Sequence, residues 1–352
     1  MRCGVFLGTR PDTLKQIPVI WELQKNSIPH DIIATGQHTT LLTSVLEEFS
    51  LKPDHSFEIK RSGLNDLSGI LLQKLHHLFN EYKYDLVIVQ GDTTTSLISA
   101  LAGFYSGAKI AHIEAGLRSF DCRDPFPEEM NRKLIGQLAD LHFPPGAAAR
   151  DNLIKEGVSP TDIHLTGNTI IDLLRITAEE YPSKENNVLI TLHRRENWGH
   201  KMECACRVIG RFAEKYPDKQ FIFPVHPNPK VKETVYNILG DSPVQLIEPL
   251  SYHDFIKLLK GAYLVITDSG GVQEEAAFLG KPVAVIRETT ERPEIIDSGA
   301  GILCGTNEQR MYSIIDKIFS DPAIHKQMKK YLKTYGDGYS SKEIVAKIKG
   351  YE

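Results

Sequence analysis

Short apolar runs alternate with longer amphipathic stretches along most of the chain, and this alternation constrains the fold more than any other feature. The runs are rich in Val, Ile and Leu, as strands of a parallel sheet are, and the stretches between them have helical periodicity. In the first half the predicted strands are Gly4–Leu7, Ile32–Thr35, Leu86–Gln90, Lys109–Ile113, Leu141–Phe143 and Ile163–Leu165. In the second half they are Val188–Leu192, Phe221–Val225, Val244–Ile247, Leu264–Thr267, Val283–Ile286 and Ile302–Cys304. The pattern predicts an α/β protein built from βαβ units.

The polar segment Ser183–Asn187 separates the two series of strands. A chain of 352 residues has room for roughly two domains at ~150 residues each. We therefore predict two Rossmann-like domains, residues 1–182 and 183–352, joined by a short hinge. The last stretch, from about Glu308 to Lys349, has no strand signal and predicts helices that could pack back against the first domain.

Composition and charge exclude several classes of protein. The chain has 41 Lys and Arg against 45 Asp and Glu, so it lacks the basic surplus of a general nucleic-acid binder. Its five cysteines are scattered, which favours a reducing compartment over a disulfide framework. Cys204 and Cys206 fall in a predicted helix, where positions i and i+2 point to different faces, so we expect no metal site there. No apolar run approaches the ~20 residues of a membrane span or forms a signal-peptide core, and we expect a cytoplasmic protein without a membrane partner.

Polar clusters begin where the predicted strands end. In the first half they are Gly8–Pro11, Gly36–His38, Gly91–Thr93 and Glu114–Arg118. In the second half they are His193–Glu196, His226–Pro229, Asp268–Gly271 and Arg287–Glu294. Ligands of open parallel sheets bind beyond the carboxyl ends of the strands. If both domains turn these ends toward each other, all the clusters line one central cleft, which is where we expect the functional site.

The segment from Asp268 to Glu275 has the features of a phosphate site. Ser269, Gly270 and Gly271 follow a predicted strand and open a helix, whose exposed N–H groups and dipole suit a diphosphate. Glu275, about one turn into the helix, could accept both hydroxyls of a ribose. A glycine turn that binds no ligand, followed by acidic residues in the first helical turn, would have the same sequence pattern.

Basic residues follow other predicted strands. Arg292 could hold phosphate oxygens opposite the helix start, because a guanidinium matches phosphate in a forked geometry. Arg10 and Lys15 follow the first strand and would add positive charge from the other wall of the cleft. The alternative is that these are solvated surface charges.

Three carboxylates and a histidine are placed to act as acids and bases. Asp92 and Glu114 end separate strands, Glu128 follows a proline-rich turn, and His193 ends the first strand of the second domain. Each carboxylate alone could be a helix cap or a salt-bridge partner. Together in one crevice they would raise one another's pKa values, which a general base working near neutral pH requires.

Several well-known motifs are absent from the sequence. There is no GxxxxGK[ST] loop, no GxSxG, no HExxH and no glycine fingerprint for a nicotinamide after the first strand. Kinase, hydrolase, zinc-protease and dehydrogenase chemistry of those types is therefore disfavoured, and we expect no cofactor.

The quoted residues resemble one family. GTRPDTLKQIPVI, TGQHTTLL, QGDTTTSLISAL, HIEAGLRSFDCRDPFPEEMNR, LTGNTIID, TLHRREN, PVHPNP, TDSGGVQEEA and GKPVAVIRETTERPE look like the non-hydrolysing UDP-N-acetylglucosamine 2-epimerases, over about residues 1 to 310. The resemblance implies a glycosyltransferase-B type fold, usually as a homodimer, that interconverts UDP-GlcNAc and UDP-ManNAc without metal or nicotinamide.

The resemblance also implies residue roles. It assigns catalysis to Asp92, Glu114, Glu128 and His193. It assigns the UDP-sugar to Arg10, Lys15, Phe255, Ser269, Gly270, Gly271, Glu275 and Arg292. Phe255 would not be chosen from its pattern, because Phe255, Ile256 and Leu259 read as a buried helix face. The chain departs from the family at Leu250, often Gln, and at Asp12, often Glu.

In the implied mechanism, a carboxylate removes the C2 proton while UDP leaves from C1, giving a 2-acetamidoglucal. UDP then adds back as a proton arrives on the opposite face of C2, so two acid/base groups are needed. A second UDP-GlcNAc activates many bacterial members, and the residues resembling that site are Gln37, Arg61, Arg194 and His226. Thr40 and Ser62 stand where activated relatives commonly carry glutamine, so we expect a weakened activator site.

Four alternatives remain open on the sequence. The chain could be an epimerase of another UDP-2-acetamido sugar, or a hydrolysing epimerase that releases ManNAc and UDP. It could be a glycosyltransferase, although that reaction would not need acidic groups for both faces of C2. A non-catalytic nucleotide-sugar binder would not need His193 and the three carboxylates together.

Overall fold

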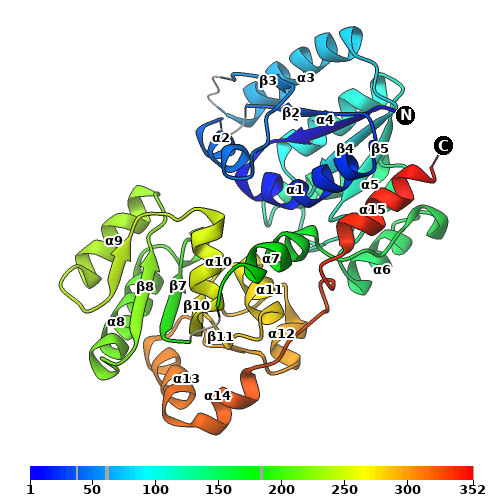
Figure 1. Ribbon diagram of the computed structural model, residues 1–352. Helices are drawn as coiled ribbons and strands as arrows, with labels where there is room; N and C mark the ends of the chain where they lie inside the picture. Colours follow the sequence, from blue (N-terminus) through cyan, green and yellow to red (C-terminus); the bar gives the residue numbers. More distant parts are fainter. Residues whose placement is uncertain (37–38, 60–62, 183–184, 352) are drawn as a thin grey trace. The chain divides into compact units, whose positions relative to one another are not determined.

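The computed structural model describes residues 1–36, 39–59, 63–182 and 185–351. The chain forms two compact units, the first made of Met1–Leu173 and Thr334–Glu352 and the second of Leu174–Lys333 (Figure 1). The change of unit falls at Leu173–Leu174, inside helix α7 (Thr169–Glu179), rather than after residue 182.

The first unit contains a six-stranded parallel sheet in the order β3-β2-β1-β4-β5-β6. Its strands are β1 (Cys3–Leu7), β2 (His30–Ala34), β3 (His55–Ser56), β4 (Leu86–Gln90), β5 (Lys109–Ile113) and β6 (Leu141–Phe143). The predicted strand Ile163–Leu165 is wrong, because that segment makes a single bridge, from Ile163 to His142. Strand β3, only two residues long, was not predicted.

Helices cover both faces of this sheet. They are α1 (Arg10–Lys25), α2 (Thr39–Glu48), α3 (Leu64–Glu81), α4 (Thr94–Tyr105), α5 (Glu128–Leu138), α6 (Ala147–Lys155) and α15 (Ser340–Lys349). Successive residues of β1 point to opposite faces, as in any strand. Val5 and Leu7 join one buried cluster with residues of α1, α2 and α15, while Phe6 joins another with residues of α3, α4 and α5. Burial on both faces explains why consecutive residues of β1 and β4 are apolar.

The C-terminal helix α15 belongs to the first unit, where it lies beside α1 (Figure 1). Its start is fixed by the buried carboxylate of Asp172, which accepts hydrogen bonds from the backbone N–H groups of Ser340 and Ser341 at 3.1 and 2.7 Å. The Ser341 hydroxyl donates to the same carboxylate at 2.6 Å. A side-chain acceptor of this kind satisfies the free N–H groups of a helix start.

The second unit contains a six-stranded parallel sheet in the order β12-β11-β10-β7-β8-β9. Its strands are β7 (Asn187–Thr191), β8 (Gln220–Pro224), β9 (Gln245–Ile247), β10 (Ala262–Thr267), β11 (Val283–Val285) and β12 (Gly301–Leu303). Each overlaps a predicted strand. Its helices are α8 (His200–Lys215), α9 (Pro229–Leu239), α10 (Tyr252–Lys260), α11 (Gly270–Phe278), α12 (Pro293–Asp297), α13 (Glu308–Ser320) and α14 (Pro322–Met328).

The two sheets have the same topology. In each unit the first strand is central, the second and third lie on one side of it, and the fourth to sixth lie on the other. This is the doubly wound Rossmann order, in which ligands bind beyond the carboxyl ends of the strands where the order reverses. The reversal lies between β1 and β4 in the first unit and between β7 and β10 in the second. No helix of the described residues has the length and apolarity that a membrane crossing requires.

Candidate active site

Glu114 is the most tightly held carboxylate at the carboxyl edge of the first sheet. It directly follows β5 and its backbone has φ 62°, a conformation that is uncommon for a non-glycine residue and is found at functional sites. Its side chain is 9% exposed. The ammonium of Lys15 lies 2.7 and 2.6 Å from its two oxygens. Gln90 and Asn168 donate to them at 2.7 and 3.2 Å.

Asp92 follows the neighbouring strand β4. Its Oδ2 accepts from Arg132 Nε at 2.7 Å, and its backbone carbonyl accepts from the Asn131 side chain at 2.8 Å. Burial raises the pKa of Asp92, and the charge of Glu114 adds to the rise while Arg132 opposes it. Asp92 is therefore more easily protonated than an exposed aspartate, as an acid/base group near neutral pH must be.

Helix α5 brings further charges to Asp92. Glu128 is its first residue and lies one turn before Arg132 on the same face. Arg132 also pairs with the buried Glu129, at 2.7 Å. The first unit thus holds Asp92 and Glu114 just after neighbouring strands, with Glu128 at the start of the helix that binds Asp92. Arg10 lies at the start of α1, in the helix that carries Lys15.

His193 is held at the carboxyl end of β7 by Asp268, a fully buried residue at the end of β10. Asp268 accepts from the backbone N–H groups of His193 and Arg194 at 3.1 and 3.0 Å, and from the side chain of Asn197 at 3.0 Å. Nδ1 of His193 lies 3.8 Å from Asp268 Oδ1. Burial lowers the pKa of His193 and Asp268 opposes this, so the imidazole is neutral at neutral pH.

The start of α11 combines features that suit an anion. Gly270 is its first residue, and the hydroxyl of Ser269 makes no capping bond to the helix. A β-carbon placed on Gly270 would lie 3.6 Å from the guanidinium groups of both Arg194 and Arg292. Two guanidinium groups beside free helical N–H groups attract phosphate. The two glycines keep the approach open, since nothing lies within 4 Å of a β-carbon placed on Gly271.

The predicted ribose and base residues lie nearby in the second unit. Glu275, 5% exposed, lies one turn into α11 and accepts from the Tyr252 hydroxyl at 3.0 Å. Phe255 is only half-buried in α10, whereas Ile256 and Leu259 are fully buried. Our reading of these three residues as one buried face is therefore wrong for Phe255, whose ring is available to a ligand.

Part of the predicted activator site can be located. Gln37, Arg61 and Ser62 lie outside the described residues. The guanidinium of Arg194, which follows β7, lies beside Gly270 at the start of α11. His226 is exposed and its ring stacks on that of His193 with centroids 5.5 Å apart.

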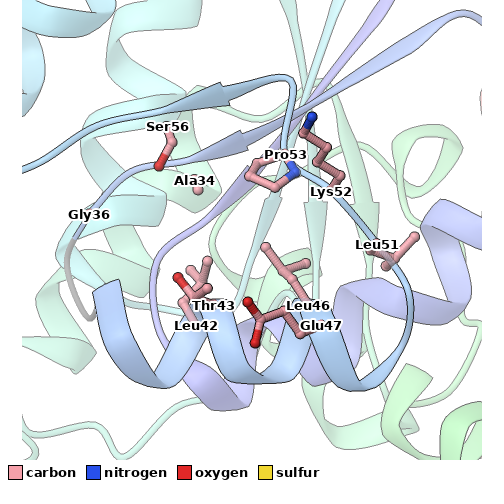
Figure 2. Close-up of a pocket in the computed structure, with 10 residues that line it drawn as sticks. All are labelled: Ala34, Gly36, Leu42, Thr43, Leu46, Glu47, Leu51, Lys52, Pro53 and Ser56. Atoms are coloured by element: carbon pink, nitrogen blue, oxygen red, sulfur yellow. The ribbon is translucent and has the colours of Figure 1, made fainter.

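A separate cavity of about 150 Å³ lies in the first unit between α2, β2 and β3. Figure 2 shows its lining, which is mostly apolar and includes Leu42, Leu46, Leu51 and Pro53. None of the predicted catalytic or substrate residues lines it. Among the described residues, no group of three or more His, Cys, Asp and Glu side chains could hold a metal ion.

Comparison with known proteins identifies the family. A family model for UDP-N-acetylglucosamine 2-epimerase matches residues 22–349. A Bacillus subtilis UDP-N-acetylglucosamine 2-epimerase is 42% identical over 360 aligned positions, which cover 99% of this chain and 95% of the relative. The chain belongs to the UDP-N-acetylglucosamine 2-epimerase family.

Solved structures of the family share the fold. The UDP-GlcNAc 2-epimerase of Neisseria meningitidis bound to UDP-GlcNAc is 36% identical, with a TM-score of 0.93 and coverage of 99% of this chain and 100% of that one. The Methanocaldococcus jannaschii enzyme in complex with UDP-GlcNAc and UDP is 34% identical, with a TM-score of 0.83 and full coverage of both chains. The predicted α/β fold with two Rossmann-like domains of the glycosyltransferase-B type is thereby confirmed.

Sequence reasoning missed the groups that hold the acids in place. Arg132 lies 40 positions from Asp92, and Asn168 lies 54 positions from Glu114. Asn168 stands in LTGNTIID, one of the segments that carry the family resemblance, but no role was predicted for it. Asp268 was predicted only as part of the polar cluster that follows a strand. Its role in holding the backbone of His193 and Arg194 was not predicted.

Proposed function

We propose that this chain is an isomerase that interconverts UDP-GlcNAc and UDP-ManNAc by inverting C2 of the sugar. The observation that carries the proposal is similarity along nearly the whole of both chains to relatives named UDP-N-acetylglucosamine 2-epimerase, at 42% and 40% identity in Bacillus subtilis and Yersinia pestis. The bound UDP-GlcNAc and UDP named for two solved relatives support a UDP-sugar ligand here.

We assign the sugar to the first unit and UDP to the second. The first unit has the carboxylates Asp92, Glu114 and Glu128, which suit proton transfer but would repel a diphosphate. The second has two guanidinium groups at a helix start, from Arg194 and Arg292. The chemical contrast between the two centres supports this assignment, with Glu275 toward the ribose and Phe255 toward the base.

The acids of the first unit account for the chemistry at C2. Removing the C2 proton from one face and returning a proton to the other needs two groups. Asp92 and Glu114 follow adjacent strands, and Glu128 begins the helix that binds Asp92, so three carboxylates are available. Loss of UDP from C1 gives the 2-acetamidoglucal, and cations at the diphosphate stabilise the charge that develops on the leaving group.

His193 suits a supporting role at the diphosphate. Its neutral ring can donate one N–H to a phosphate oxygen, and Asp268 fixes the backbone from which the ring projects. The same carboxylate accepts from the Arg194 N–H, so one buried residue places both side chains near the start of α11.

Turnover in D₂O tests the proposed function. We expect one deuterium at C2 of both UDP-GlcNAc and UDP-ManNAc, because the C2 hydrogen is lost to a carboxylate that exchanges with solvent. Proton NMR of the nucleotide sugars measures this directly. Retention of the original hydrogen at C2 would rule out elimination, and release of free ManNAc with UDP would identify a hydrolysing enzyme instead.

A homodimer is the assembly that we infer, and exposed apolar side chains on the first unit support it. Phe104 and Tyr105 at the end of α4 are 54% and 71% exposed, and Met130 and Leu134 on the neighbouring α5 are 40% and 45% exposed. Contiguous exposed apolar patches mark protein interfaces, and α4 and α5, which carry these residues, are in contact. Sedimentation equilibrium should therefore give twice the monomer mass, and the monomer mass would contradict this inference.

A further inference from the structure

The carboxylates of Asp12, Asp92 and Glu114 interact with one another near the reversal point of the first sheet. Glu114 pairs with Lys15, and Asp92 pairs with Arg132. The third is Asp12, in the first turn of α1, which is 8% exposed. Within the described parts of the chain Asp12 has no ion pair, and its Oδ2 has no hydrogen-bond partner. A buried charge without a partner is costly, so this arrangement favours the neutral form of Asp12.

Asp12 and Glu114 approach the same point of the backbone. A β-carbon placed on Gly91 would lie 3.4 Å from Glu114 Oε2 and 3.9 Å from Asp12 Oδ1. Gly91 has φ 64° and precedes Asp92, so all three carboxylates surround one short turn after β4. Neighbouring like charges in a buried site cannot all ionise at little cost, and the carboxylate that has no ion pair is the one that keeps its proton.

The groups that face Asp12 come from three elements. Thr9 and Lys15 lie on its own helix start, Asp92 follows β4, and Glu114 follows β5. Burial raises the pKa of Asp12 to about 7; Thr9 and Lys15 oppose the rise, and both carboxylates add to it.

The buried His112 supplies no compensating charge to this centre. Its Nε2 lies 2.7 Å from the Gly91 carbonyl oxygen. Burial lowers the pKa of His112 to about 3, so the ring is neutral in the working range. The proton on Asp12 is then what limits the negative charge of the centre near neutral pH.

We propose that Asp12 is a further positioning residue of this centre, whose proton limits the negative charge around Asp92 and Glu114, the carboxylates that exchange protons with C2. The role rests on the proposed epimerase function. With Asp12 neutral, the acid centre of the first unit has one fewer negative charge. When Asp12 ionises, its charge opposes the negative charge that develops on the sugar as the C2 proton is removed. Turnover should therefore fall as pH rises through the ionisation of Asp12.

The rate profile of Asp12→Asn tests this role. Asparagine has the shape of the neutral acid and cannot ionise, so kcat at pH 6 should stay within about threefold of wild type, while the fall in kcat above about pH 7 should disappear. Asp12→Glu can ionise, so its kcat should again fall as pH rises. Asp66→Asn, an exposed aspartate in the first turn of α3, is the matched control and should leave the profile unchanged.

A second measurement does not depend on activity. The pKa of folded Asp12 lies above its unfolded value of about 4, so ionisation destabilises the folded chain as pH rises from there to about 7. Urea unfolding should show wild type losing stability relative to Asp12→Asn across that window, with no further change above it. If the wild-type chain shows this linkage but no epimerisation, the proposed function fails and the protonation of Asp12 stands.

Two results would overturn the proposal. In the first, kcat of Asp12→Asn still falls above about pH 7, and the difference in unfolding free energy between wild type and Asp12→Asn does not vary with pH. The other is a folded Asp12→Asn chain that is inactive at every pH, because Asp12 would then transfer the proton itself.

Discussion

Glu114→Gln is expected to lower kcat for UDP-GlcNAc by roughly 100-fold or more, the usual size of a general acid/base contribution. Glutamine keeps the shape of the side chain but cannot accept the C2 proton. It also removes the negative partner of Lys15, whose ammonium contacts both carboxylate oxygens. Steady-state kinetics on the purified variant measure the effect.

The dissociation constant for UDP distinguishes a loss of catalysis in Glu114→Gln from a general loss of folded structure. The anion site is in the second unit, so UDP affinity should be close to wild type in Glu114→Gln. Glu58→Gln, an exposed glutamate of the first unit, should leave both kcat and UDP affinity unchanged. A Glu114→Gln chain that turns over within a few-fold of wild type would remove Glu114 from the acid/base set.

Most of the sheet could be predicted because its strands are buried on both faces. Val5, Phe6 and Leu7 show this directly, since neighbouring residues enter different apolar clusters and all must be apolar. The wrongly predicted strand at residues 163–165 has the opposite cause, because the segment is apolar in pattern but not buried on both faces. The Ile-x-Leu pattern resembles a strand, but Leu165 is 46% exposed and the segment has one bridge to β6. Strand β3 is too short to leave any periodic signal.

The positions of the acids were also predictable, because parallel strands end at the same edge of a sheet. Asp92 and Glu114 each follow a strand, and those strands are adjacent. Their ion-pair partners could not be read in the same way. Arg132 comes from a helix that begins 36 positions after Asp92, and its contact depends on how α5 packs on the sheet. Local patterns carry no information on such a contact.

Asp12 illustrates a further limit of local patterns. In the sequence it is an ordinary acidic residue in the first turn of a helix, where a carboxylate usually favours the helix dipole. Its unusual protonation comes from burial beside Asp92 and Glu114, which are distant in the chain.

Arg292→Ala is expected to weaken UDP binding by about 10- to 100-fold, which corresponds to the ~1.5–3 kcal/mol of a hydrogen bond to a charged group. The Arg292 guanidinium lies 3.6 Å from a β-carbon placed on Gly270, at the start of the helix proposed to hold the diphosphate. Isothermal titration with UDP measures the change. Arg310→Ala, which removes an exposed arginine of the same unit, should leave UDP affinity unchanged.

Arg292→Ala should also destabilise the fold, and this effect must be separated from the loss of UDP binding. Arg292 Nε also binds Glu274 Oε1 at 2.5 Å, and the Glu274 side chain is 3% exposed. Removing one partner of a buried ion pair destabilises a protein by ~3–5 kcal/mol. The double variant Arg292→Ala/Glu274→Gln should recover much of that stability in urea unfolding, because the buried charge is gone, yet it should bind UDP as weakly as the single variant. If the double variant instead recovers wild-type affinity for UDP, the loss in the single variant comes from the buried Glu274 charge, and the diphosphate does not bind at Arg292.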